Sequence, residues 1–254
     1  MSLPSNHQDD NNFNFSGKSD LELNESMLIN YNINITNIIY KNSKIEEIKK
    51  AMGQPRVLDF GAGQGTLTDL ISAKTKMDIE CVEIDPSLKA KLFDRGFKVC
   101  DLNALRLDYD LIFSSNVLEH IEDDLGVLTM LAQKIKPNGV IVIYVPALMM
   151  LFSDLDTHFG HFRRYSRREL IDKVERAGLK VVKIRYADSL GFFASIVLKI
   201  FGYRNNVNLG GETSLKIYDK FIFPVSLLLD NIGFNRLFGK NLYIVATTSK
   251  RDLV

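Results

Sequence analysis

Short apolar runs alternate with segments of helical periodicity from about residue 56 onward. The runs are rich in Val, Ile and Leu, which is typical of buried parallel strands. They are Arg56–Phe60, Asp78–Ile84, Phe97–Cys100, Tyr109–Ser114 and Gly139–Val145. Between them, apolar residues recur every three or four positions in Thr66–Ala73, Ser87–Asp94 and Asp123–Ile135. The alternation predicts an α/β protein with a doubly wound, mostly parallel sheet and helices on both faces.

The flanking segments complete this plan. A further helix is expected at Arg167–Ala177, a sixth strand at Lys180–Tyr186, and a seventh and last strand at Asn241–Ser249. The predicted organisation is a disordered tail (1–20), an N-terminal helical cap of one or two helices (21–53), an α/β core (54–186), an apolar helical insertion (187–240) and the final strand (241–254).

The insertion is the most apolar part of the chain. Ser189–Phe201 is apolar on nearly every helical face, and Leu215–Leu229 is amphipathic, with an expected kink at Pro224. A helix of this kind must be covered, so a lid, a dimer interface, a platform in the membrane surface and an extra internal core all remain open. No uncharged apolar run reaches the roughly 20 residues that a membrane-spanning helix needs.

The charge balance narrows the choice of partners. The chain carries 32 basic and 31 acidic side chains, a formal net charge of +1. It therefore has no global field to attract a polyanion, and we expect no nucleic-acid partner. The polar N-terminus lacks the basic start and apolar core of a signal peptide, so a cytoplasmic location is expected, with peripheral membrane contact open.

The densest motif runs from Val57 to Gly65. A predicted strand leads directly into three alternating glycines, Gly61, Gly63 and Gly65, and then into a helix. Glycines permit positive φ and close approach of a ligand to the backbone, and a helix N-terminus favours an electron-rich group. The strand, turn and helix context indicates a ligand-binding loop.

Acidic residues mark the ends of the first three strands. Asp59, Glu83 and Asp101 suit a ligand that carries an ammonium group, a ribose and an adenine, because a carboxylate can accept both ribose hydroxyls. NAD is a competing ligand, but its fingerprint is GxGxxG, and Thr66 stands where the last glycine would be. An NAD-dependent oxidoreductase is therefore the weaker alternative.

These motifs resemble those of the class I S-adenosylmethionine-dependent methyltransferases. The resemblance covers about residues 54–183 and rests on VLDFGAGQGTLTDLI, VEIDPS, Asp101 and YDLIFSSNVLEHIED. It implies that the glycines hold the methionine part of the donor, that Asp59 faces its amino group, and that Glu83 and Asp101 meet its ribose and adenine. Ile84, Leu102 and Asn116, which follow the second, third and fourth strands, are assigned to the same site. The resemblance also implies that the last strand lies antiparallel beside the fifth.

Two strings suggest the kind of acceptor. The fourth strand is followed by Leu118-Glu119-His120, and not by the Asn/Asp-Pro-Pro-aromatic motif of enzymes that methylate amino groups of DNA bases or glutamine. The Leu-Glu-His form resembles the branch that acts on small metabolites, quinone precursors and sugars. The His-x-Arg-Arg-Tyr string at 161–165 resembles bacterial methyltransferases linked with surface-polysaccharide or lipid-carrier pathways.

The candidate catalytic residues are His120 and His161, because a neutral imidazole can accept a proton near pH 7. A purely structural histidine at position 120 is an equal alternative. The predicted substrate-binding residues are His158, Arg163, Arg164 and Tyr165. No metal is predicted, because the Asp154-x-Asp156-x-His158 spacing has no further ligand at a diagnostic distance.

The arginines lie around the helix that begins at Arg167, where Ser166 and Glu169 have capping-box spacing. Positive charge is unfavourable at a helix N-terminus and needs compensation. An anionic acceptor would supply it, and so would ion pairs with Asp154, Asp156 and Glu169.

The sequence thus predicts an S-adenosylmethionine-dependent methyltransferase that acts on a small, anionic or lipid- or sugar-linked acceptor, with a homodimer open. The alternative from a different class is a non-catalytic or membrane-peripheral module that binds an adenosine ligand.

Overall fold

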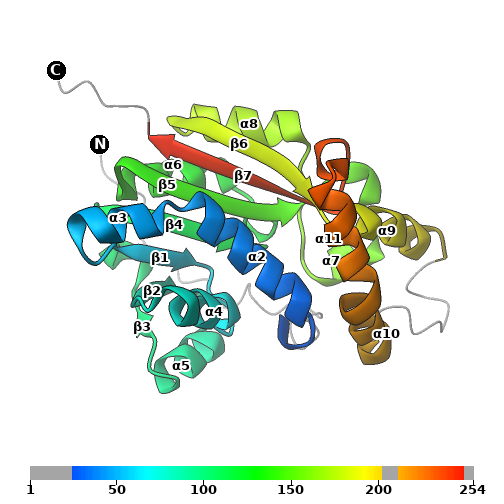
Figure 1. The fold of residues 1–254 in the computed structure, drawn as a ribbon, viewed down its shortest axis with the longest axis horizontal. Coiled ribbons are helices and arrows are strands. Elements are labelled where there is room, and N and C mark those ends of the chain that lie inside the picture. The colour runs from blue at the N-terminus through cyan, green and yellow to red at the C-terminus, as the bar shows by residue number, and fades with distance from the viewer. Residues whose placement is uncertain (1–24, 202–210, 249–254) are drawn as a thin grey trace.

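A computed structural model describes residues 25–201 and 211–248, and the predicted tail 1–20 lies outside these ranges. Seven strands form one sheet in the order β3-β2-β1-β4-β5-β7-β6 (Figure 1). Strand β7 is antiparallel to both neighbours, whereas the remaining pairs are parallel. The predicted fold class and the antiparallel final strand beside the fifth are confirmed. The strands are β1 (Val57–Phe60), β2 (Ile79–Val82), β3 (Lys98–Val99), β4 (Tyr109–Ser115), β5 (Ile135–Pro146), β6 (Leu179–Ala187) and β7 (Asn241–Thr248).

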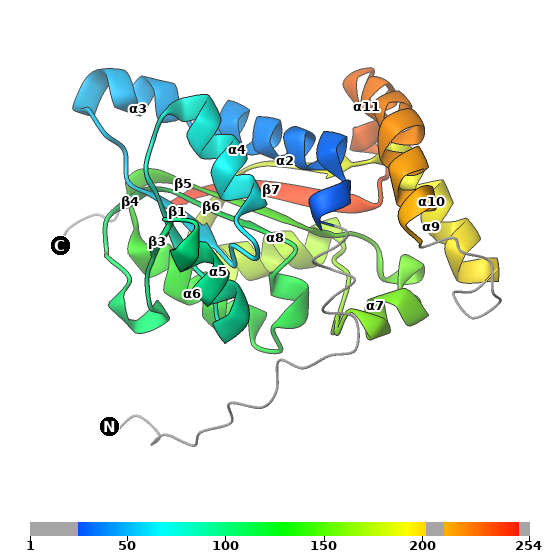
Figure 2. The ribbon, with the colours of Figure 1, turned by 90° about the horizontal axis from the view of Figure 1, so that it is seen from below.

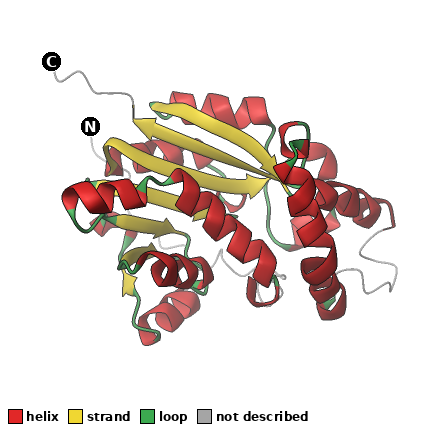
Figure 3. Cartoon of the chain, in the orientation of Figure 1, coloured by secondary structure: helices red, strands yellow, loops and turns green. Residues whose placement is uncertain are grey.

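Helices cover both faces of this sheet, as Figures 2 and 3 show. The elements outside the insertion are α2 (Ile29–Asn42), α3 (Ile45–Met52), α4 (Thr66–Thr75), α5 (Pro86–Asp94), η1 (Leu102–Ala104), η2 (Leu118–His120), α6 (Asp124–Lys134), η3 (Met149–Leu151), α7 (Asp154–His158) and α8 (Arg167–Arg176). The helix expected at Arg167 begins there, because the Ser166 side chain accepts a hydrogen bond from the Glu169 amide.

Successive side chains of each strand point to opposite faces of the sheet, so the core has two layers. On one face, Ile39 of α2 and Ile71 of α4 pack against alternate side chains of the central strands, such as Phe113. On the other face, Leu128 of α6 and Leu170 of α8 pack against the intervening side chains. Because both faces of the central strands are buried, these strands are continuous apolar runs, which is why the sequence revealed them.

The insertion forms helices beyond the carboxyl edge of the sheet. It contains α9 (Ser189–Phe201), α10 (Glu212–Ile217), a π-helical turn η4 (Tyr218–Ile222), α11 (Phe223–Asn231) and η5 (Phe234–Arg236). The interruption expected at Pro224 takes the form of this π-helical turn, which ends just before that residue. In the described ranges no helix has the length and apolar character needed to cross a bilayer.

The helices of the insertion bury polar groups. The Asp219 carboxylate accepts hydrogen bonds from the Asn30 and Tyr31 amides at the start of α2, at 2.9 and 3.0 Å. The Asp230 carboxylate likewise accepts hydrogen bonds from the Asp188 and Ser189 amides at the start of α9. The segment from η4 to α11 therefore buries two carboxylates that cap helix N-termini, together with the apolar side chain of Phe223.

Candidate functional site

The glycine loop, residues 61–65, links β1 to α4 and has a backbone that only glycine adopts easily. Gly61, Gly63 and Gly65 have φ angles of 79°, 55° and 83°. An added Cβ at Gly61 would lie 2.3 Å from a methyl group of Val117, and one at Gly65 would lie 2.8 Å from Leu92. Side chains are therefore excluded at Gly61 and Gly65 by backbone conformation and by space, and disfavoured at Gly63 by backbone conformation.

Asp59 lies beneath the glycine loop. Its side chain is buried and accepts a hydrogen bond of 2.6 Å from the Thr68 hydroxyl of α4. Burial, together with the negative charges of Glu25 and Glu83, raises the pKa of Asp59 to about 7, although the hydrogen bond from Thr68 acts to lower it. A cationic group bound nearby would favour the ionised carboxylate, which fits the ammonium group of the expected donor.

Glu83, directly after β2, ties the second strand to the glycine loop. One carboxylate oxygen accepts a hydrogen bond from the Gly63 amide at 2.8 Å, and the other accepts from the Ile84 and Asp85 amides at 2.8 and 2.9 Å. Burial raises the pKa of Glu83. The oxygen that faces Gly63 keeps a lone pair, so the residue can still accept a hydrogen bond from a ribose hydroxyl.

The remaining predicted donor residues lie at neighbouring strand ends. Ile84 and Leu102 expose 49% and 40% of their surface, which gives a flat adenine ring apolar side chains to pack against. Asp101 is exposed and forms an ion pair with Lys89, so an adenine amino group would share that carboxylate. Asn116, after β4, has a positive φ of 53° and an exposed side chain.

Glu25 is a neighbour of this loop that sequence reasoning missed. Its carboxylate is 3.5 Å from the Gln64 amide and 3.4 Å from the Thr66 amide at the N-terminus of α4. No motif marks this residue, because it reaches the loop from the helical cap only through the fold. Its position shows that the loop and the helix N-terminus attract a carboxylate, which the methionine part of the donor also carries. The geometry therefore fits the donor.

The two predicted catalytic histidines are 41 positions apart in sequence and lie side by side. Their ring centroids are 4.7 Å apart in an edge-to-face arrangement. His120 lies in η2 after β4, whereas His161 belongs to the basic loop, residues 158–165, after α7. Burial, together with the charge of His161, lowers the pKa of His120 to about 4. His120 is therefore neutral near pH 7.

Asp156 fixes the orientation of His161. Its Oδ1 lies 2.9 Å from His161 Nδ1, and the same oxygen accepts a 2.7 Å hydrogen bond from Arg164 Nε. Burial alone would raise the pKa of Asp156, but hydrogen bonds from His161 and Arg164 lower it to about 2. A permanently ionised carboxylate on Nδ1 leaves Nε2 of His161 available to accept a proton.

Glu119 is the least satisfied group of this cluster. It is fully buried, and neither carboxylate oxygen has a hydrogen-bond partner among the described residues. Burial raises the pKa of Glu119 to about 7, while the charge of His161 favours the ionised form. Ligand atoms of Glu119, His120 and His161 lie within 4.8 Å of one another, close enough to share an ion. The predicted absence of a metal stays a prediction that can be tested.

In the basic loop, two of the predicted substrate-binding residues, Arg164 and Tyr165, lie inside the protein. Tyr165 is fully buried, and its hydroxyl donates a 2.7 Å hydrogen bond to Asp124 of α6. Arg164 is buried against Asp156. Because both polar groups are engaged inside the protein, neither is placed to contact an acceptor. Tyr165 and Arg164 therefore hold the loop in place.

Arg163 is largely neutralised in the same way. Its Nη1 lies 2.8 Å from Asp124 Oδ2, and its Nη2 donates to the Glu122 carbonyl at 2.9 Å. Asp156 was among the carboxylates expected to neutralise the arginines, but Asp124 was not. His158 is half-buried, with its ring tilted against Phe159, and its substrate role stays a prediction.

Comparison with known proteins places the chain in a family. Residues 36–184 match the methyltransferase domain family, and this match covers more than half of the chain. The chain therefore belongs to the methyltransferase domain family, and the predicted methyltransferase family is confirmed. An uncharacterized protein of Synechococcus sp. is 29% identical over 110 residues, which are 38% of this chain and 26% of that protein. The chain thus spans about a quarter of the length of this curated relative.

Solved structures share the fold at low sequence identity. A SAM-dependent methyltransferase from Archaeoglobus fulgidus has a TM-score of 0.51 and 18% identity, over 80% of this chain and 92% of that chain. Phosphoethanolamine N-methyltransferase 2 from Haemonchus contortus has a TM-score of 0.51 and 16% identity, over 83% and 53%. The [4+2]-cyclase SpnF has a TM-score of 0.53 and 11% identity, over 85% and 81%. Identities this low show a common fold and leave the acceptor open.

Proposed function

We propose that this protein methylates a hydroxyl group of a lipid- or sugar-linked acceptor, with His161 as the general base. The observation that carries the proposal is the Asp156–His161 pair, which meets His120 and Glu119 at the carboxyl edge of the sheet. When bound at the glycine loop, S-adenosylmethionine supplies an electrophilic methyl group. The protein then has to align the acceptor and remove its proton.

The groups around His161 favour its role as a general base. As the acceptor oxygen forms its new bond to carbon and the carbon–sulfur bond breaks, the hydroxyl proton passes to His161 Nε2. The resulting imidazolium is stabilised by the ionised Asp156 on Nδ1 and by the buried carboxylate of Glu119. His120 remains neutral beside it, and hydrogen bonds to the backbone of Phe159 and Gly160 hold its ring against His161.

The arginines of the basic loop do not favour a strongly anionic acceptor. Asp124 and Asp156 already balance Arg163 and Arg164, so little positive charge remains for a ligand. The lipid- or sugar-linked class therefore has more support than a free anionic metabolite.

An exposed apolar surface supports the lipid-linked reading. Phe193, Val197 and Ile200 form an outward stripe on α9, which contacts η3. Met149 and Met150 of η3 are also exposed, and this segment lies between β5 and the basic loop. A second stripe follows α10 to α11: Ile217, Phe221, Val225, Leu228 and Ile232. Unlike an ordinary surface helix, which buries its apolar side, α9 and the segment from η4 to α11 expose these stripes, although Phe223 is buried.

We further propose that these stripes dock on an anionic bilayer. The exposed charges that accompany them in the described insertion are mostly basic: Lys199, Lys216, Lys220 and Arg236, against Glu212. A two-fold dimer through this surface would bring like charges together, whereas anionic headgroups would complement them. An acceptor anchored in the membrane would then be presented close to the basic loop.

Methyl transfer from a tritium-labelled donor tests the function. Incubation with an organic extract of source membranes should label the organic phase, and His161→Asn should reduce labelling about hundredfold while donor affinity is retained. Arg168→Gln, at an exposed position outside the histidine cluster, serves as the control. Label confined to water-soluble products would contradict the lipid-linked acceptor. Donor binding without transfer to either fraction would favour the non-catalytic alternative.

Flotation with phosphatidylglycerol vesicles tests membrane docking. The double substitution Phe221→Asp with Leu228→Asp should abolish flotation. Phe93→Asp, which changes an exposed phenylalanine of α5, should not. Binding to neutral phosphatidylcholine vesicles should be weaker, and salt should reduce binding to the anionic ones. A protein that stays in the supernatant, or a dimer that the double variant dissolves, would overturn bilayer docking.

A further inference from the structure

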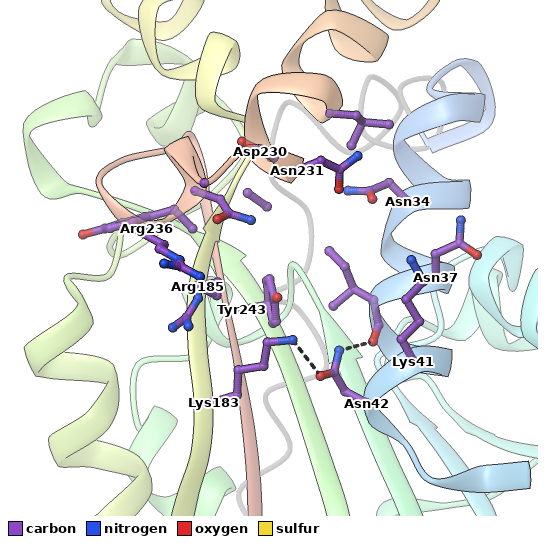
Figure 4. Close-up of a pocket in the computed structure, with 16 residues that line it drawn as sticks. Asn34, Asn37, Lys41, Asn42, Lys183, Arg185, Asp230, Asn231, Arg236 and Tyr243 are labelled. Atoms are coloured by element: carbon purple, nitrogen blue, oxygen red, sulfur yellow. Dashed lines mark hydrogen bonds between the residues drawn. The ribbon is translucent and has the colours of Figure 1, made fainter.

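A cavity lies on the α2 face of the sheet, apart from the glycine loop and the basic loop. Its volume is about 420 Å³, and Figure 4 shows its walls. One wall is α2, the opposite wall is β6 and β7, and the end of α11 with η5 closes one end. This part of the sheet is open because α2 packs over β5, whereas α8 covers β6 from the opposite face.

The cavity carries excess positive charge. Lys41 of α2, Lys183 and Arg185 of β6, and Arg236 of η5 line it, and in residues 25–201 and 211–248 none of these four forms an ion pair with a carboxylate. The Lys183 ammonium donates a 3.1 Å hydrogen bond to the neutral side chain of Asn42 (Figure 4). Burial, together with the charges of Arg185 and Lys41, lowers the pKa of Lys183. These cations repel one another, so an anion among them would be stabilising.

Among the described lining residues, the one carboxylate, Asp230, can balance the charge of only one of these four cations. Asp230 accepts hydrogen bonds from the Asp188 amide at 2.8 Å and the Ser189 amide at 3.2 Å, and it also binds the Ser189 hydroxyl. Its role at the start of α9 is therefore fixed by the fold.

The rest of the lining suits a ligand rich in hydroxyl groups. Four asparagines besides Asn42 contribute side-chain amides: Asn34, Asn37, Asn231 and Asn235. The amide oxygen of Asn37 also accepts a 3.0 Å hydrogen bond from Lys74 of α4. The volume lies within the range of small-molecule sites, but such sites are usually mostly apolar. A polar wall with basic side chains on one strand matches a ligand that has an anionic end and several hydroxyls.

We propose that this cavity binds a phosphorylated sugar, with its phosphate between Lys183 and Arg185 and its hydroxyls against the asparagines of α2. The guanidinium of Arg185 offers a planar fork for phosphate oxygens, although one of its amino groups also donates to the Ile184 carbonyl at 2.8 Å. The cavity is separate from the donor and acceptor residues, so this site stands whether or not the chain methylates a lipid-linked acceptor.

Isothermal titration calorimetry of the full chain tests the site with glucose 1-phosphate, inorganic phosphate and glucose. Glucose 1-phosphate should bind more tightly than phosphate, and glucose most weakly. Lys183→Gln and Arg185→Gln should each weaken glucose 1-phosphate binding about tenfold, because each removes a charged hydrogen bond. Lys180→Gln is the matched control, since it removes the same charge from an exposed position of β6.

Three results would overturn the proposal. One is the lack of saturable binding of either phosphate compound up to about 10 mM. Another is equal weakening by Lys180→Gln, which would indicate bulk electrostatics. The third is a dimer in sedimentation that Lys183→Gln with Arg185→Gln dissolves, which would make the cavity an interface between copies. Binding of S-adenosylhomocysteine, measured in parallel, reports on the donor site and on the integrity of each variant.

Discussion

The glycine loop and the basic loop both follow strands at the carboxyl edge of the sheet, yet the sequence predicted the backbone of the first and not the ion pairs of the second. In the glycine loop, the backbone determines the residue, because positive φ angles and the nearby Val117 and Leu92 leave no space for a side chain. In the basic loop, distant carboxylates determine the role of each arginine. A motif set by local backbone geometry can be interpreted from sequence, whereas the role of a charge depends on partners that only the fold brings together.

The largest expected effect tests whether the basic loop is structural. Arg164→Gln leaves the buried Asp156 without its strongest cationic partner, so the free energy of unfolding should fall by about 3–5 kcal/mol. Chemical denaturation measures this change, and Arg168→Gln, at an exposed position of the same helix start, is the control. A variant as stable as the wild type would return Arg164 to the list of candidate acceptor contacts.

A second prediction concerns the pH dependence caused by Glu119. Its pKa in the folded state is about 7, above the ordinary value of 4.5, so the folded state holds the proton more tightly than the unfolded chain. This contribution to stability is present below about pH 4.5 and is lost as the pH rises through about 7.

Glu119→Gln should therefore become more stable relative to the wild type between pH 5 and pH 8, by roughly 3 kcal/mol. Denaturation curves at several pH values measure the difference. A constant difference across this range would mean that Glu119 keeps an ordinary pKa.

The absence of a metal can be tested at the same cluster. Chelators should leave the pH dependence of stability and the activity unchanged. Stoichiometric binding of Zn²⁺ to the wild type, lost in Glu119→Gln, would refute the prediction that no metal binds.

The third prediction concerns the ends of the second and third strands, where the donor is expected to bind. Glu83→Ala removes the acceptor for the ribose and the tie to the Gly63 amide, so affinity for S-adenosylhomocysteine should fall about tenfold to hundredfold. Asp101→Ala should have a smaller effect, since Asp101 is exposed and paired with Lys89. Calorimetry ranks the two, and the reverse order would show that the ligand contacts the third strand end more than the second.

The smallest effect is expected for Tyr165→Phe. The variant loses the 2.7 Å hydrogen bond to Asp124 but keeps its ring in the core, so stability should fall by about 1 kcal/mol. Donor affinity and methyl transfer should remain at wild-type levels in steady-state assays. A loss of activity at unchanged stability would restore the original assignment of Tyr165 to the acceptor site.

These two regions also explain how far the sequence could be interpreted. The positions of the seven strands along the chain and the start of α8 follow from local periodicity and capping residues, so they could be predicted. The antiparallel last strand beside the fifth was expected only from the family resemblance. The ion pair of Asp124 with Arg163 and the approach of Glu25 to the glycine loop join residues about 40 positions apart, and no local signal marks them. The helices of the insertion were recognised as apolar, but no local signal marks the burial of Asp219 against the start of α2.

Donor binding at the glycine loop is the central claim, and calorimetry with S-adenosylhomocysteine and NADH tests it most directly. The wild type should bind S-adenosylhomocysteine at one site per chain, and Gly63→Val should abolish binding because it blocks the loop at a position with positive φ. Gly178→Val, which places the same side chain at a φ of 84° with open space around it, should bind as the wild type does. Tight binding of NADH with no binding of S-adenosylhomocysteine would contradict the claim.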